Sequence, residues 1–528
     1  MDQRGWEYKE INTMLSERVQ RHPNKVYIHS PDQQKGITFE QTYLWCNKVA
    51  NFLKRQSIKS SDRIVLIGEN SVETLLIYLG VLNYGATICP VNVEESKENA
   101  YRLLNVAKPR MVFYGKALAF DQERYGGGRW IAYGDLDAGK GQENGFFAMI
   151  RDYDAHFETP VGGKDDVMII VFTSGTTGMA KGVVHSRESF LFTPRGHIDR
   201  MHITEKDTIL DYRVYSWAST QGMAILPGLM VGATVIFANG FSRSRFPSWV
   251  KKHHVTIAIG VPTVLNFLLE QPVPLHKGDV PSLRFMTSSA APLLTKNQLE
   301  FEKRYGIPIV QASGSSETGV IGGVDPEDVL DPEKRRIGST GKAHRYADVS
   351  ILDDDGNRYK PGEEGEIVVN SGGIAIGYLE PDGEITRFPE GGIRTGDLGH
   401  IDDEGYVYIT GRKKDVIIRG GVNISPMEIT GWLAEHPTVQ EAATVGVPDK
   451  AYGEEVASFV VLKPNQTVGQ DDLVNHCRKK LPDFKLPKTI CFVSEIPKTG
   501  RQKVAKALLL EIWEKQFKEA AATGGKRR

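Results

Sequence analysis

One run of residues combines small, flexible and hydroxylated side chains with a single lysine, a composition suited to binding phosphate. The run is Thr173-Ser-Gly-Thr-Thr-Gly-Met-Ala-Lys-Gly182, and its lysine is Lys181. Glycines can adopt positive φ and bring backbone N–H groups close to an anion, while hydroxyls and an ammonium add donors and charge. A surface turn is the alternative, and for a bare glycine-rich loop it is the commoner one. The phosphate interpretation therefore depends on agreement from other sites.

Further charged residues lie in loop-like segments that could act on the same ligand. Glu317 ends the small-residue run 312–317, Asp397 lies in Arg394-Thr-Gly-Asp-Leu398, Arg412 lies in Gly411-Arg-Lys-Lys-Asp415, and Lys503 ends Ile496-Pro-Lys-Thr-Gly-Arg-Gln-Lys503. By residue type alone, each has an ordinary explanation. Glu317 could begin a helix, Asp397 could stabilise a turn, and the two cations could be solvated surface charges.

The elements around the lysine run predict where it lies. Residues 167–172 form a continuous apolar run, which is typical of a strand buried on both faces of a parallel sheet. The run 173–182 would then leave the carboxyl end of a strand, where open α/β sheets bind their ligands. Residues 288–292 and 312–317 are small-residue loops that follow predicted strands in the same way. Three such loops predict one shared cleft.

Strand and helix patterns alternate along the first 310 residues, which predicts an α/β fold. Short strands and turn signals dominate residues 338–408 and predict a β-rich subdomain, and the charged run 411–415 suggests a domain boundary. A small α+β domain is expected beyond it, ending in a frayed tail from Ala520. The predicted helices are 38–55, 71–84, 94–107, 247–253, 426–435 and 471–480, and the predicted strands are 64–67, 86–89, 111–114, 167–172, 234–237, 256–259, 283–286, 309–310, 442–445 and 457–462.

Composition limits the partners. The chain has 528 residues, of which 40% are hydrophobic, and its 65 basic and 66 acidic residues nearly cancel. No overall field attracts nucleic acid or an anionic membrane, and neither a signal peptide nor a membrane span is expected. Four cysteines without metal-ligand spacing favour a reducing, cytoplasmic location. The sequence is compatible with a homodimer and does not determine the oligomeric state.

Three motifs in order, 173–182, 394–398 with 411–415, and 496–503, make the chain from residue 38 to residue 506 resemble the adenylate-forming superfamily, in its acyl-CoA synthetase branch. The resemblance implies a large N-terminal domain, residues 1–411, with two α/β sheet layers and the β-rich subdomain, which binds ATP and a carboxylic acid. A small mobile α+β domain, residues 412–528, would rotate about a hinge near Lys414. The acid would attack the α-phosphate of ATP and release pyrophosphate, and coenzyme A would then take the acyl group from the adenylate.

The same resemblance assigns roles to residues. Lys503 would promote adenylation and Glu317 would bind Mg²⁺ together with Thr173. Asp397 and Arg412 would hold the ribose, Gly420 and Gly421 would lie in a loop that reaches the site during transfer to CoA, and Trp217 and Arg213 would lie near the acid. The residues implied on the phosphates are Thr173, Ser174, Gly175, Thr176, Thr177, Gly178 and Lys181, and those implied near adenine are Ala290, Ala291, Pro292, Ser313, Gly314, Ser315 and Ser316.

The sequence departs from the family pattern at three places. Ala312 and Ser313 precede Gly314, where the family has an aromatic residue stacked on adenine. Residues 211–217 lack the Pro-Leu-Phe-His run of many relatives, so Trp217 could wall a short acyl pocket or belong to the core, and Arg213 could pair with the substrate or with a neighbouring acid. Gln502 replaces the glycine that usually precedes the lysine.

Three other functions are compatible with part of the pattern. A P-loop NTPase needs Gly-x4-Gly-Lys-Ser/Thr, whereas Gly182 follows Lys181. A nucleotide-binding module without catalysis would not need Glu317, Asp397 and Lys503 together. An adenylating enzyme that loads a carrier protein is the nearest alternative, although the motif at 420–428 is the form common among CoA ligases.

Overall fold

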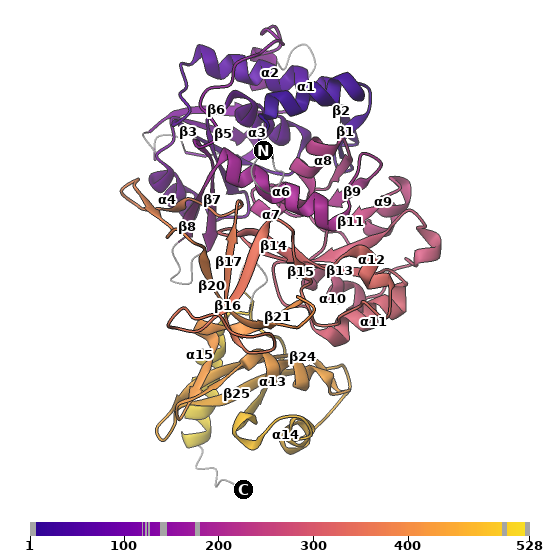
Figure 1. The fold of residues 1–528 in the computed structure, drawn as a ribbon, viewed down its shortest axis with the longest axis vertical. Coiled ribbons are helices and arrows are strands. Elements are labelled where there is room, and N and C mark those ends of the chain that lie inside the picture. The colour runs from indigo at the N-terminus through magenta and orange to yellow at the C-terminus, as the bar shows by residue number, and fades with distance from the viewer. Residues whose placement is uncertain are drawn as a thin grey trace.

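Two large sheets and the helices around them make up most of the molecule, a computed structural model that describes residues 7–118, 120–121, 124, 127–137, 145–174, 180–498 and 504–522. Two smaller sheets follow along the chain, and the last of them lies with α15 at the lower end of Figure 1. The predicted α/β class, with a β-rich part and a small α+β unit at the C-terminal end, is confirmed.

Hydrogen bonding between neighbouring strands gives the four sheets the following strand orders. The nine-stranded sheet is β15 (Lys342–Ala343), β14 (Gly319–Gly323), β13 (Ile309–Ser315), β12 (Phe285–Ser288), β11 (Ile257–Ala258), β9 (Thr208–Asp211), β10 (Thr234–Phe237), β1 (Val26–Ser30) and β2 (Lys35–Thr38). The eight-stranded sheet is β19 (Ile385–Arg387), β18 (Gly377–Leu379), β8 (Ala180–Ser186), β7 (Val167–Ser174), β4 (Thr87–Asn92), β3 (Arg63–Gly68), β5 (Met111–Gly115) and β6 (Arg129–Tyr133). The four-stranded sheet is β16 (Ala347–Leu352), β17 (Gly365–Ser371), β20 (Ile393–Ile401) and β21 (Val407–Arg412). The five-stranded sheet is β23 (Val422–Ile424), β22 (Ile417–Arg419), β25 (Gly453–Leu462) and β24 (Val439–Asp449), with β26 (Thr489–Phe492) beside β25.

The helices lie mainly between strands of the two large sheets. They are α1 (Ile11–Arg21), α2 (Phe39–Arg55), α3 (Val72–Tyr84), α4 (Lys97–Ala107), α5 (Phe146–Met149), α6 (Arg187–Met201), α7 (Ala218–Thr220), the π-helix η2 (Gln221–Ile225), α8 (Leu226–Val231), α9 (Phe246–Lys252), α10 (Pro262–Glu270), α11 (Thr295–Tyr305), α12 (Pro326–Leu330), α13 (Pro426–Glu435), α14 (Gln470–Arg478) and α15 (Lys506–Ala522). Four short 3-10 helices are η1 (Lys116–Leu118), η3 (Lys277–Asp279), η4 (Lys413–Asp415) and η5 (Asp483–Lys485).

Helix α3 is the centre of the N-terminal core. Every residue of α3 is buried, and the helix contacts β1 and β2 of one large sheet and β3 and β4 of the other. A helix that is apolar on all sides is stable only where protein surrounds it. As predicted, Ser71 caps its start by accepting the N–H of Thr74, and Gly85 ends it in the left-handed conformation with φ +103.

Several sequence predictions need correction. Strand β7 is parallel to β4 but antiparallel to β8, so the sheet is mixed where a parallel one was predicted. The expected loop 312–317 is largely the end of β13, which turns into β14 as an antiparallel hairpin. The three ligand loops also come from two sheets, because β7 belongs to the eight-stranded sheet and β12 and β13 to the nine-stranded one. Apolar runs predict strands but carry no information about the direction of their neighbours.

The C-terminal end also differs from the prediction. Helix α15 continues to Ala522, so residues 520–522 of the expected tail are helical, and the rest of that tail lies outside the described residues. Helix α4 also differs, because it begins at Lys97, with Ser96 as its cap, rather than at 94.

All four cysteines are buried and free, as expected for small hydrophobic residues. Within the described ranges, no helix has the length and hydrophobicity needed for a bilayer crossing.

The side chain of Asn70 joins the carboxyl ends of the two large sheets. It follows β3, it is 5% exposed, and its amide donates to the carbonyls of Arg213 and Ala238, both at 2.9 Å. Its side-chain oxygen accepts the N–H of Tyr215 at 2.9 Å. Arg213 and Tyr215 follow β9, and Ala238 follows β10. One buried amide therefore sets the spacing of the strand ends between which the candidate site lies.

We predict that Asn70→Ala lowers the free energy of unfolding by about 3 kcal/mol, because three buried backbone groups lose their partner and each such loss costs about 1 kcal/mol or more. Urea unfolding followed by tryptophan fluorescence measures the change. Asn105→Ala on the exposed side of α4 is the matched control and should stay within about 0.5 kcal/mol. Equal effects of the two substitutions would contradict the role of Asn70.

Candidate active site

Residues 173–174 and 180–182 of the lysine run lie in β7 and β8, which pair as the antiparallel strands of a hairpin. Thr173 and Lys181 lie opposite each other in this hairpin, and the hydroxyl of Thr173 lies 3.5 Å from the carbonyl of Lys181. The intervening Gly175, Thr176, Thr177 and Gly178 lie outside the described residues. The pairing of the two strands therefore places Lys181 beside the carboxyl end of β7.

Tyr378 connects Lys181 to Glu317. The ammonium of Lys181 lies 4.6 Å from the centre of the Tyr378 ring, and the Tyr378 hydroxyl donates to the Glu317 carboxylate at 3.1 Å. Burial, with the Glu317 carboxylate nearby, raises the pKa of Tyr378, so its hydroxyl stays protonated and donates. The strand β18, which carries Tyr378, pairs with β8 next to Lys181. A cation suited to phosphate thus lies over the Tyr378 ring, and a carboxylate suited to metal accepts from the Tyr378 hydroxyl.

His185 supports the backbone beside Glu317. Its Nε2–H donates to the carbonyl of Ser316 at 2.7 Å, and its Nδ1 accepts from the hydroxyl of Ser189 at 3.2 Å. Burial lowers the pKa of His185 to about 4, although the Ser316 carbonyl and the Glu317 charge oppose the shift. His185 is therefore neutral at pH 7, which matches one donating and one accepting ring nitrogen.

Glu317 is suited to Mg²⁺ only when phosphate supplies further ligands. No group of three or more His, Cys, Asp or Glu side chains able to hold a metal occurs in the described part of the chain. The Glu317 carboxylate accepts from the Tyr378 hydroxyl, and Thr173 offers a hydroxyl at the end of β7. Mg²⁺ commonly takes one or two protein carboxylates and completes its shell with water and substrate phosphates. The residues present therefore fit a nucleotide-bound Mg²⁺ rather than a resident ion.

The loops expected near adenine lie at the ends of β12 and β13. Ala290, Ala291 and Pro292 are exposed, and Ala290 has φ +69, an unusual backbone conformation for alanine that is often found at functional sites. Gly314 must be a glycine, because a Cβ there would lie 2.4 Å from the carbonyl of Gly319. Gly314 and Ser315 are exposed at the hairpin end, and Ser313 and Ser316 beside them are half-buried.

Asp397 and Arg412 form a cross-strand pair between β20 and β21, with Arg412 Nε 2.8 Å from Asp397 Oδ1. Glu366 organises the same strands: it accepts from Arg394 at 2.9 Å and from Lys413 at 3.2 Å. Burial alone would raise the pKa of Glu366, but these two cations hold it below its ordinary value. The ribose candidates thus lie on a sheet in which the buried carboxylate of Glu366 pairs with two exposed cations.

Arg213 is fully occupied by the protein itself. Its guanidinium donates to both oxygens of Asp211, at 3.0 and 2.7 Å, to the hydroxyl and carbonyl of Ser219, both at 3.1 Å, and toward the sulfur of Met223 at 3.8 Å. Five donors are all that arginine has. Of the two alternatives for Arg213, the structure shows the pairing with a neighbouring acid. Trp217 is half-buried and precedes α7.

The C-terminal candidates lie on separate elements. Lys414 is exposed in η4, directly after β21. Gly420 and Gly421, with φ +58 and +85, form the two-residue turn between β22 and β23, a geometry that glycine favours. Lys503 lies outside the described residues.

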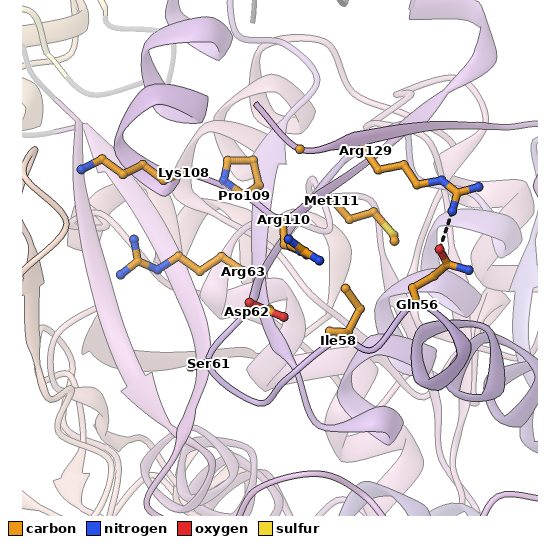
Figure 2. A pocket seen from close by; sticks show the side chains of 11 residues that line it. Gln56, Ile58, Ser61, Asp62, Arg63, Lys108, Pro109, Arg110, Met111 and Arg129 are labelled. Carbon is orange, nitrogen blue, oxygen red and sulfur yellow. Dashed lines mark hydrogen bonds between the residues drawn. The ribbon is translucent and has the colours of Figure 1, made fainter. Parts of the chain in front are cut away.

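A cavity of about 660 Å³ opens at the other end of the eight-stranded sheet, beside the starts of β3, β5 and β6 (Figure 2). Arg63 and Lys108 line it but donate to the carbonyls of Gly383 and Asp382, at 3.1 and 2.5 Å, which attaches the β18–β19 turn to the sheet. Arg129 donates to Gln56. These basic side chains serve the fold at an end of the sheet remote from the phosphate hairpin.

Residues 15–379 match the model of the AMP-binding enzymes, and residues 428–503 match that of the AMP-binding enzyme C-terminal domain. The chain belongs to the AMP-binding enzyme family. It is 32% identical to the sulfoacetate–CoA ligase of Cupriavidus necator, over 95% of this chain and 97% of that protein. It is 30% identical to the long-chain-fatty-acid–CoA ligase FadD13 of Mycobacterium tuberculosis, over 95% and 98%. ATP-bound MatB from Rhodopseudomonas palustris superposes with a TM-score of 0.84 at 26% identity, over 96% and 99% of the two chains.

This AMP-binding enzyme is therefore an AMP-forming acid–CoA ligase that uses ATP, Mg²⁺, CoA and a carboxylic acid. The relatives do not favour the carrier-protein alternative.

Two residues of the site, Tyr378 and His185, were not predicted from the sequence. Tyr378 lies in a strand of three residues, which is too short to show a hydrophobic period. His185 lies on β8 after Lys181, and the alternation of residues 181, 183 and 185 along a strand is the signal that could have placed them on one face.

We predict that Tyr378→Phe raises the Mg²⁺ concentration for half-maximal AMP formation roughly tenfold, because a hydrogen bond to a charged group contributes about 1.5 kcal/mol. The variant keeps the ring beside Lys181. Tyr378→Leu also removes that ring and should further raise KM for ATP about threefold. Tyr359→Phe, at an exposed tyrosine, is the control. Identical Mg²⁺ curves for Tyr378→Phe and the wild type would contradict the contact.

A second prediction concerns pH. The pKa of His185, about 4 in the folded protein, lies below the ordinary 6.5, so the neutral form stabilises the fold above pH 6.5 and this stability is lost as the pH falls toward 4. His185→Gln should reduce the loss of unfolding free energy between pH 6.5 and 4 by about 3 kcal/mol. Urea unfolding at several pH values measures it. His156→Gln, at a side chain that is 63% exposed, should leave the slope unchanged.

Proposed function

We propose that this chain activates a small or medium organic acid as its acyl-adenylate and then transfers the acyl group to CoA. The observation that carries the proposal is the Lys181–Tyr378–Glu317 arrangement, because it brings a phosphate-binding cation and a metal-binding carboxylate to one strand end. In the first step a carboxylate oxygen of the acid bonds to the α-phosphorus of ATP, and the bond to the β-phosphate breaks. In the second, the CoA sulfur bonds to the acyl carbon and AMP leaves.

The ATP triphosphate is assigned to the β7–β8 hairpin. Donors from Thr173 to Gly178, with Lys181, would hold the β- and γ-phosphates and stabilise the pyrophosphate as it leaves. Mg²⁺ would be held by Glu317, with Thr173 nearby, and would neutralise phosphate charge. Asp397 and Arg412 are assigned to the ribose, which the acceptor-only carboxylate of Asp397 suits. Adenine is assigned to the surface between Ala290–Pro292 and Ser313–Ser316.

The C-terminal residues are assigned to the two steps separately. Lys503 would offset the repulsion between the acid and the α-phosphate during adenylation. We place the boundary between the domains at residues 411/412 and the hinge at Lys414, which lies directly between the last strand of one sheet and the first strand of the next. The Gly420–Gly421 turn would then approach the site for transfer to CoA. A cytoplasmic location remains our prediction and is compatible with four free cysteines.

The acid itself is assigned to the region of Trp217. Arg213 would support this region by fixing Asp211 and Ser219, since its own donors are occupied. Relatives named for sulfoacetate and for long-chain fatty acids show that the family accepts chemically different acids, so the name of one relative does not identify the acid of this chain.

We predict that Lys503→Ala lowers the rate of acid-dependent pyrophosphate release at least 100-fold, because loss of one donor to a developing oxyanion costs about 3 kcal/mol. The same variant should still convert a supplied acyl-adenylate and CoA to thioester at close to the wild-type rate. Lys515→Ala, which makes the same charge change on exposed α15, is the control and should preserve both reactions. Equal loss of both half-reactions in Lys503→Ala would contradict the assignment.

A further inference from the structure

Five buried polar groups near Trp217 have no hydrogen-bond partner among the described residues. They are Ser216 Oγ, Trp217 Nε1 and Thr220 Oγ1 before the π-helix η2, His197 Nδ1 on α6, and Ser288 Oγ at the end of β12. Ser216, Thr220, His197 and Ser288 are each at most 6% exposed. An unpaired buried polar group costs about 1–3 kcal/mol, and a bound molecule is one of the few things that explain several together.

Contacts of η2 connect the elements that carry these groups. The N–H of Thr220 donates to the carbonyl of Trp217 at 3.0 Å, which folds that segment into a tight turn at the start of η2. On the α6 side, a Cβ at Gly222 would lie 3.9 Å from the His197 ring. On the β12 side, Met223 Sδ lies 3.8 Å from the hydroxyl of Ser289, next to Ser288. Short π-helices are frequent at functional sites.

The same element adjoins the site for ATP and metal. Thr193 of α6 would contact a Cβ at Gly222 at 3.1 Å, and on its other side it approaches Gly319, two residues after Glu317. Ser289, which Met223 contacts, precedes the exposed Ala290–Pro292 segment. Met223 also lies 3.8 Å from Arg213, which follows β9. Through Thr193 and Ser289, η2 therefore adjoins the segments beside Glu317 and Ala290, which are assigned to metal and adenine.

The five groups carry no net charge. Asp211 neutralises Arg213, and every donor of Arg213 is engaged. Burial lowers the pKa of His197 to about 3, with His344 and Arg213 adding to the shift, so His197 is neutral. A second charge on the acid would be desolvated without a counter-ion here, whereas an alkyl group would leave hydroxyls and an indole N–H unpaired.

We propose that the preferred acid carries, away from its reacting carboxylate, an uncharged hydrogen-bonding group such as a hydroxyl or a ketone, which pairs with up to three of the polar groups of Ser216, Trp217, Thr220, His197 and Ser288. The inference rests on the proposed function. Because the indole N–H can only donate, the group must contain an acceptor oxygen.

The test uses the full chain with ATP, Mg²⁺ and CoA, and measures kcat/KM for AMP formation on acids of matched length. The acids are 4-hydroxybutanoate and 4-oxopentanoate, with pentanoate as the aliphatic and succinate as the dianionic counterpart. The hydroxy or oxo acid should exceed both counterparts at least about tenfold, because sites that hydrogen-bond a substrate group discriminate strongly against analogues that lack it. A preference for pentanoate or succinate would overturn the inference and leave the proposed function intact. If none of a broad panel of acids yields AMP, the proposed function fails, and the inference fails with it.

Two variants separate recognition from structure. Thr220→Val and Ser288→Ala should each lower kcat/KM for the hydroxy acid about tenfold, lower it little for pentanoate, and leave KM for ATP unchanged. Replacing an unpaired buried hydroxyl by an apolar group should also maintain or raise the thermal midpoint of the free protein. Thr467→Val, at an exposed threonine, is the matched control. Equal losses for the hydroxy acid and pentanoate would indicate a structural role and overturn the assignment.

Discussion

The buried amide of Asn70 is the constraint on which the site depends, because it ties the ends of strands from two different sheets. Asn70 contacts the segments after β9 and β10 together, while Tyr215 donates to the Leu66 carbonyl, Asn239 donates to the Glu69 carboxylate, and α3 packs between the sheets. Apolar packing is not directional, whereas a fully used amide sets distances between named backbone atoms. The phosphate hairpin belongs to one sheet and the acid region to the other, so their spacing depends on this joint.

Two electrostatic environments meet at that joint. Lys181 on β8 and Glu317 between β13 and β14 both contact Tyr378, and a cation near a carboxylate suits a polyanion with a divalent cation. On the side of the nine-stranded sheet, the charges of Arg213 and Asp211 cancel, His197 is neutral, and buried hydroxyls remain. Under the proposed assignments, ATP and the acid would meet different electrostatic environments, and the carboxylate to be activated would lie at their boundary.

Much of the fold could be predicted from local pattern. Helix α3 has its predicted cap and end, and β10 and α13 have their predicted bounds. The predicted β-rich segment contains the four-stranded sheet. Hydrophobic period and capping chemistry are encoded by neighbours in sequence, which explains this success. The direction of β8 against β7, the extension of β13 to Ser315 and the length of α15 were not predicted, because each depends on packing against distant segments.

The candidate site divides in the same way. By itself the sequence determined the residue types and their order, Thr173 to Lys181, Glu317, Asp397, Arg412 and Lys503, and through them the family and the general reaction. Only the tertiary structure decided that Tyr378 contacts both Lys181 and Glu317, that Asp211 occupies Arg213, and that α6, β12 and the segment before η2 carry buried polar groups without a described partner. The physical reason is that motifs are contiguous and carry their chemistry in residue type, whereas charge compensation and hydrogen-bond satisfaction depend on neighbours in space that may be more than a hundred residues away.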